Sequence, residues 1–190
     1  MCCQISTIIA IETGDSSVTR ARTLRDLDHV DRNILSILQG DGRIANAELA
    51  KRINLSPTPT LERVRRLERD GFIESYVAVL NSYKMEAAMT AFVEVNLDRT
   101  TEDVLKRFAQ AALATPEIIE CNMIAGGFDY LLKIRVEDMV AYRKFMGARL
   151  AELPGIRATH TFMVMEKIKD ETAFPVGLPV QKEARPHTHK

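Results

Sequence analysis

The first third of the chain carries apolar residues at helical spacing, in stretches bounded by residues that start or stop helices. One stretch follows Asp28, a suitable N-cap, and ends at Gly40. The next begins at Asn46 and gives way to a turn at residues 54–55. Their inward positions are Val30, Ile34, Leu35, Ile37 and Leu38 in the first stretch, and Leu49, Ala50 and Ile53 in the second. The pattern predicts a longer helix followed by a shorter one.

A third helical stretch begins directly after that turn. Ser56 can cap it, Pro57 suits its first position, and Pro59 still lies in the first turn, where a missing N–H costs little. Its apolar positions recur every three residues, at Leu61, Val64 and Leu67, and Gly71 ends it. Residues 72–80 then become rich in β-forming types. We therefore expect three helices followed by a β-rich stretch.

Beyond residue 81 the periodicity alternates between strand and helix. We expect strands at residues 91–97, 118–125, 130–136 and 156–168, one helix capped by Thr101 and one capped by Asp138. This βαββαβ order is that of a ferredoxin-like domain, in which the helices cover one face of the sheet. The other face is left open and partly apolar, so we expect a second copy to cover it.

The patterns together predict an α+β protein with two domains. A helix-turn-helix domain occupies residues 25–80, and a linker at 81–87 leads to a βαββαβ domain at 88–170. Residues 1–24 have no sustained periodicity and are expected to be a flexible extension. Residues 171–190 contain several prolines without periodicity, so a flexible tail is expected there.

Composition adds little to this picture but limits the function classes. The 26 basic and 26 acidic residues cancel, so any contact with nucleic acid or membrane must rest on local clustering. Three cysteines fit neither a disulfide framework nor a CxxC metal site, which favours a reducing cytoplasm. The apolar N-terminal stretch lacks a basic flank and is too short to span a bilayer. We expect no metal and no cofactor.

Local charge does cluster from the end of the second helical stretch through the third. Residues 51–69 hold six basic side chains against two acidic ones. Three short helices with a tight turn between the second and third form a helix-turn-helix, whose third helix enters the DNA major groove. Ser56, Thr58 and Thr60 add small hydroxyls at the end that would meet the bases. The alternative is an ordinary solvated helix face, although such a face does not require this division between hydroxyls and cations.

Three segments of the chain carry a resemblance to a known family. They read LDHVDRNILSILQGDGRIANAELAKRINLSPTPTLERVRRLERDGFI, GGFDYLLKIRVEDMVAYRKFMG and LPGIRATHTFMVMEKIK. They resemble the leucine-responsive regulatory protein (Lrp/AsnC) family of prokaryotic transcription regulators, in register over residues 27–169. The resemblance implies a winged helix-turn-helix followed by an amino-acid-sensing domain, homodimers that assemble into tetramers, octamers or larger rings, and an effector bound between sensing domains. A small amino acid such as leucine is the expected effector.

The resemblance also suggests residues for each site. Groove-facing candidates are Ser56, Thr58, Thr60 and Arg63, with Thr58, Thr60 and Arg63 the first choices, and phosphate-contacting candidates are Arg43, Lys51, Arg65 and Arg66. In the effector site, Gly126 and Gly127 would supply N–H groups and Asp129 the acid, with Met123, Met139, Phe162 and Met163 as the apolar wall. The plain alternative is that the glycines and Asp129 only build a turn and the methionines fill the core. Leucine-responsive members commonly have Asp at the position of Gly127, so the identity of the amino acid stays open.

Two other functions are compatible with the same two-domain plan. Decarboxylases that act on sirohaem resemble this chain in both domains and use histidine around the tetrapyrrole. Here His29 and His160 fall in different domains, and no nucleophile-base set or phosphate loop accompanies them. A sensing or assembly protein that no longer binds DNA is the third possibility. The basic third helix favours a DNA-binding regulator over both.

Overall fold

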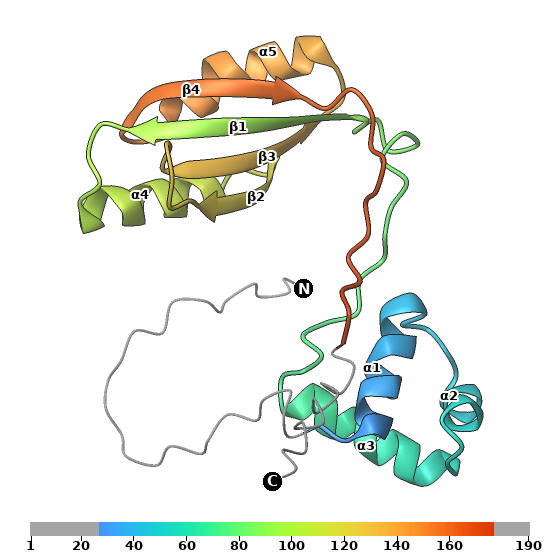
Figure 1. Cartoon of the computed structure of the whole chain (residues 1–190). Helices are drawn as coiled ribbons and strands as arrows, with labels where there is room; N and C mark the ends of the chain where they lie inside the picture. The colour runs from blue at the N-terminus through green and yellow to red at the C-terminus, as the bar shows by residue number, and fades with distance from the viewer. Residues whose placement is uncertain (1–26, 177–190) are drawn as a thin grey trace, which may run out of the picture. The chain divides into compact units, whose positions relative to one another are not determined.

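The chain folds into two units. The computed structural model describes residues 27–176. Within them, the helical unit comprises residues 27–77 with 171–176, and the sheet unit comprises residues 78–170 (Figure 1). The extension expected at residues 1–24 and the part of the expected tail at 177–190 lie outside the described residues. Residues 171–176 were expected in that flexible tail, but they belong to the helical unit.

Three helices form the helical unit, as the periodicity predicted. They are α1 (His29–Gly40), α2 (Asn46–Arg52) and α3 (Pro57–Arg69). The Asp28 carboxylate caps α1 by accepting the Asp31 N–H at 2.8 Å. The chain leaves α3 through Gly71, whose φ of +76° lies in the left-handed region that glycine adopts without strain. Ile34, Leu49 and Leu67 pack together at the centre and exclude water from the three helices.

The β-rich stretch expected at residues 72–80 forms no strand within the described chain. Its side chains are largely in solvent: Val77 and Val79 are 76% and 84% exposed. A strand needs a neighbour to pair its N–H and C=O groups, and nothing in the described chain runs beside these residues in register. The stretch therefore forms no strand in a single chain, although its residues favour one.

The sheet unit has the predicted ferredoxin-like order. Its elements are β1 (Met89–Leu97), α4 (Glu102–Leu113), β2 (Ile118–Met123), β3 (Tyr130–Val136), α5 (Met139–Ala148), a 3₁₀ turn (Leu150–Glu152) and β4 (Ile156–Met163). The four strands lie in the order β2-β3-β1-β4 and all pairs are antiparallel (Figure 1). The last strand was expected to reach residue 168 but ends at Met163. The α+β fold predicted from the sequence is confirmed.

Strand alternation separates the two faces of the sheet. Val93 and Leu132 point to the face that α4 and α5 cover, where they pack with Phe108 and Phe145 in one core. The opposite face carries both charged and aromatic side chains. In register, Phe92 lies opposite Phe162, Glu94 opposite His160, and Glu120 opposite Lys133. Phe162 is 55% exposed, so this face retains apolar surface in the single chain.

Candidate DNA-binding and effector sites

One face of α3 is open to solvent and could meet DNA. Its exposed residues are Pro57, Thr58, Leu61, Glu62, Arg65, Glu68 and Arg69, which recur at intervals of three and four. Ser56, the residue before the helix, is exposed as well. The side-chain amide of Asn46 in α2 donates to the Pro57 carbonyl at 2.8 Å and so joins α2 to the start of α3. The helical pattern placed Asn46 at the start of α2 but gave no sign of its contact with α3.

Thr60, a first choice for reading a base, does not lie on that face. Its side chain is fully buried, and its hydroxyl donates to the Ser56 carbonyl at 2.9 Å. Thr60 lies on the inner side of α3, together with Val64 and Leu67. This side faces away from the exposed one. The assignment of Thr60 to the groove is therefore corrected: it is a core residue of the helical unit.

Arg63 and Arg66 are engaged by acidic residues of α1. The Asp31 carboxylate, only 2% exposed, accepts from Arg63 at 2.8 Å and from Arg66 at 2.6 Å. Arg63 also reaches Asp28 at 2.7 Å. Hydrogen bonds to Asp28 and then to Asp31 raise the pKa of Arg63. Both arginines thus attach α3 to α1; they are still 27% and 34% exposed, and their contacts to base and phosphate stay predictions.

This cluster of Asp28, Asp31, Arg63 and Arg66, the α1–α3 charge cluster, was not found from the sequence. Its signal was present: two acids lie three residues apart at the start of α1, and two arginines lie three residues apart on α3. The charges of α3 alone do not show this pairing, because both acids lie at the start of α1. Two of the six basic residues at positions 51–69 are neutralised inside the unit, so the excess positive charge facing outward is smaller than the sequence suggested.

The other predicted DNA contacts are exposed. Ser56 and Thr58 lie at the start of α3, and Arg65 lies two turns further along its open face. Lys51 lies in the last turn of α2, and Arg43 lies in the connection between α1 and α2. Their exposure is compatible with contact to a duplex.

The predicted effector residues divide into two groups at opposite ends of the sheet. Met123 and the β2–β3 turn with Gly126 and Gly127 lie where β3 begins. Met139 follows the far end of β3, which spans about 20 Å from Tyr130 to Val136 at the usual rise per residue. Phe162 and Met163 pair with Phe92 and Ala91, also near that far end. Being successive strand residues, they point to opposite faces.

One chain does not bring Met123, Met139, Phe162 and Met163 together, so a wall made of all four needs side chains from more than one copy. Period-two alternation and strand length both separate them. Only Met123, Gly126, Gly127 and Asp129 share one end of the sheet. A pocket built on the turn requires its remaining wall from elsewhere.

Asp129 has a structural partner at this end. Its Oδ2 accepts the Leu97 N–H at 2.7 Å, and its own N–H donates to the Val95 carbonyl at 2.9 Å. Its carbonyl accepts the Ile124 N–H at 2.9 Å, which closes the turn. Asp129 thus fixes the turn to the end of β1. Gly126 and Gly127 are exposed on the turn, and a Cβ added at Gly127 would meet no atom within 4 Å.

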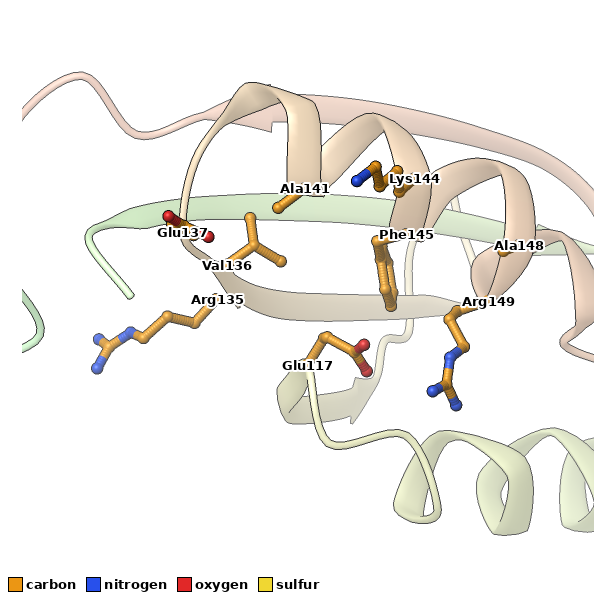
Figure 2. Close-up of a pocket in the computed structure, with 9 residues that line it drawn as sticks. All are labelled: Glu117, Arg135, Val136, Glu137, Ala141, Lys144, Phe145, Ala148 and Arg149. Carbon is orange, nitrogen blue, oxygen red and sulfur yellow. The ribbon is translucent and has the colours of Figure 1, made fainter. Parts of the chain in front are cut away.

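A separate cavity of about 380 Å³ opens between α5 and the ends of β2 and β3 (Figure 2). It is lined by Glu117, Arg135, Val136, Glu137, Ala141, Lys144, Phe145, Ala148 and Arg149. Glu117 Oε2 and Arg135 Nε are buried there without a hydrogen-bond partner in the structure. None of the predicted effector residues lines it.

Two properties of residues 27–176 concern membranes and metal ions. Every helix in this range is too short or too polar to span a bilayer. The same residues contain no group of three or more His, Cys, Asp and Glu side chains placed to hold a metal ion. His29 lies in the helical unit and His160 in the sheet unit.

Comparison with known proteins gives matches to both units. Residues 27–74 match a winged helix-turn-helix DNA-binding family, and residues 90–174 match the Lrp/AsnC ligand binding domain. The leucine-responsive regulatory proteins of Klebsiella pneumoniae and Escherichia coli K12 are each 54% identical over 158 residues, covering 83% of this chain and 96% of theirs.

Solved structures agree with these matches. A Neisseria meningitidis transcriptional regulator in complex with L-Met has a TM-score of 0.76 and 34% identity over 79% of this chain and 97% of its own. An AsnC family regulator from Agrobacterium tumefaciens has a TM-score of 0.76 and 37% identity at the same coverage. The relatives are named transcription regulators, so the sirohaem-decarboxylase alternative is set aside and the chain is not an enzyme. The predicted resemblance is confirmed: this chain belongs to the Lrp/AsnC family of DNA-binding transcription regulators.

Proposed function

We propose that this protein binds operator DNA as a homo-oligomer through α3, and that a small amino acid bound at the β2–β3 turn changes its DNA affinity or its oligomeric state. The observation that carries the proposal is the open face of α3, which presents Thr58 and Arg65 while its opposite side is anchored to α1. The relatives are named for their response to leucine, and the Neisseria regulator holds L-Met.

Base reading on this face would depend on side chains. A helix N-terminus normally offers several unpaired N–H groups to phosphate. Pro57 and Pro59 have no N–H, so Thr58 supplies the only backbone donor among the first three positions of α3. The hydroxyls of Ser56 and Thr58 are then the groups that can discriminate bases, with Arg65, Lys51 and Arg43 on phosphate.

For the effector, we propose a site at the β2–β3 turn that a second copy completes. The exposed N–H groups around Gly126 and Gly127 suit a carboxylate, and Met123, 62% exposed, suits an apolar side chain. Asp129 retains a second carboxylate oxygen for an ammonium group while Oδ2 holds Leu97. A neighbouring copy would supply the rest of the wall, as a site between sensing domains requires.

The open sheet face supports the homo-oligomer. It presents Phe92 and Phe162 side by side across β1 and β4, with the basic Lys133 beside Phe92 on β3 and the acidic Glu94 next on the same face of β1. A mixed face of this kind suits pairing with a second copy, in which opposite charges and apolar patches meet.

The test is fluorescence anisotropy with an operator fragment, measured with and without each of the twenty amino acids. We expect binding that weakens steeply with salt, and a change in affinity or stoichiometry with one or a few small apolar amino acids. Affinity no better than that of an unrelated neutral protein would contradict the DNA-binding role. The absence of any response to all twenty would contradict the sensing role.

A further inference from the structure

The chain beyond Asp170 returns to the helical unit and binds α1. The side-chain amide of Gln39, near the end of α1, makes two hydrogen bonds to the backbone of Phe174: its Nε2 donates to the Phe174 carbonyl and its Oε1 accepts the Phe174 N–H, both at 2.9 Å. These two bonds pair Gln39 with an extended backbone as a neighbouring strand would. Two such bonds fix which residue of the segment lies opposite Gln39, but they do not depend on the identity of that residue's side chain.

At Phe174 the backbone makes the contact and the side chain does not, whereas Val176 binds through its side chain. The Phe174 side chain is 72% exposed, so it contributes little to the contact. Val176, two residues on, packs against the apolar core of the helical unit. Pro175 favours an extended backbone at Phe174 and removes conformations that the free segment would otherwise sample. A short segment therefore loses less entropy on binding than its length suggests.

We propose that the end of α1 around Gln39 is a binding surface for the chain's own residues 173–176. The first and last residues of the sheet unit, Ala78 and Asp170, both continue into the helical unit. One connection is the linker after Val77. The other connection is the segment after Asp170, and the contact at Gln39 attaches this segment to α1.

A consequence for regulation rests on the proposed function. The segment follows β4, which ends at Met163, and α1 carries Asp31, which holds Arg63 and Arg66 of α3. A displacement of β4 on effector binding would then reach α3 through residues 173–176 and α1. Releasing the segment should uncouple DNA affinity from the effector while leaving α3 intact.

The first experiment measures amide hydrogen exchange at residue 174 in the full chain, without DNA or effector. Gln39→Leu should speed exchange about tenfold, the factor expected from the loss of these hydrogen bonds. Phe174→Ala should keep the protection, because the backbone bonds remain. Gln110→Leu, at an exposed helical glutamine in the sheet unit, is the matched control and should change nothing. Exchange at the unprotected rate in the wild type, or unchanged protection in Gln39→Leu, would overturn the proposal.

Binding between copies is the competing arrangement. A mixture of Gln39→Leu and Phe174→Pro chains distinguishes it, because the Phe174 backbone of the first could then bind the intact Gln39 of the second, while the second has no amide at residue 174. Protection that stays lost in the mixture supports binding within one chain. Restored protection would overturn that assignment.

The second experiment compares operator affinity with and without effector in Phe174→Pro and Phe174→Ala. Proline removes the N–H that Gln39 accepts, so we expect the effector-dependent ratio to fall at least about threefold toward unity, while alanine retains it. An unchanged ratio in Phe174→Pro would overturn the regulatory consequence. A wild type without any effector response would refute the proposed sensing function, and the exchange experiment would still decide whether Gln39 binds the segment.

Discussion

Replacing Asp31 should destabilise the helical unit more than replacing any exposed acid of the chain. The Asp31→Ala change removes a carboxylate that is 2% exposed and accepts from both Arg63 and Arg66. Removing one partner of a buried ion pair typically costs about 3–5 kcal/mol. The two arginines are 27% and 34% exposed, and Arg63 keeps Asp28, so solvent and the remaining partner reduce the loss. We expect about 2–3 kcal/mol, a large share of the roughly 5–15 kcal/mol that holds a small domain together.

The assay is urea unfolding of the full chain followed by the exchange or NMR signals of Ile34, which reports on the helical unit alone. Asp31→Asn, which keeps one acceptor oxygen but no charge, should fall between wild type and Asp31→Ala. The control is Asp103→Ala, because Asp103 forms an exposed i,i+4 pair with Arg107 in the other unit and should leave the Ile34 transition unchanged. A loss below about 0.5 kcal/mol in Asp31→Ala would refute the reasoning, since it would mean that the two arginines need no buried partner.

Three further predictions concern DNA, the effector turn and pH. Arg65→Ala should weaken binding to all duplexes alike and flatten the salt dependence by about one unit if Arg65 contacts phosphate, and anisotropy over a salt series measures this. Asp129→Ala should free the Leu97 N–H, lower the stability of the sheet unit by about 1–2 kcal/mol and abolish effector binding in calorimetry; tight binding by the folded variant would disprove the assigned role. Burial opposes ionisation of Asp28, but hydrogen bonds from Asp31 N–H and Arg63 outweigh it and lower its pKa. Asp28 should therefore stabilise the unit above its unfolded pKa and lose that contribution as pH falls through the folded value, so Asp28→Asn should reduce the acid sensitivity of the Ile34 transition.

The helices and strands and their order could be predicted from the sequence, because each element depends on a local pattern of residues. Ser56 with Pro57 marked the start of α3, and alternation marked β1 and β3. Both units could therefore be assigned to a fold before any contact was known.

Residue roles depended on information that the linear pattern lacks. Thr60 is polar and close to Thr58, but the helical rotation between them turns one inward and the other outward. The pattern of α3 gave no sign that Arg63 pairs with Asp31, because that partner lies 32 positions earlier in the chain. Met139 and Met123 have the same chemistry, and only the strand between them shows that they lie apart. The contact between the Gln39 side chain and the Phe174 backbone was not predicted, because a backbone contact does not affect the periodicity of side chains.

The α1–α3 charge cluster also affects how the protein would search a chromosome. Non-specific affinity grows with the number of phosphates that cations neutralise, and a genome offers an enormous excess of wrong sites. Asp28 and Asp31 offset the charges of Arg63 and Arg66, so these arginines attach α3 to α1 while adding little net charge to attract arbitrary DNA. A relative with the same basic residues but without the acids of α1 would be retained longer at every wrong site. Internal neutralisation thus favours a regulator that leaves non-operator DNA quickly.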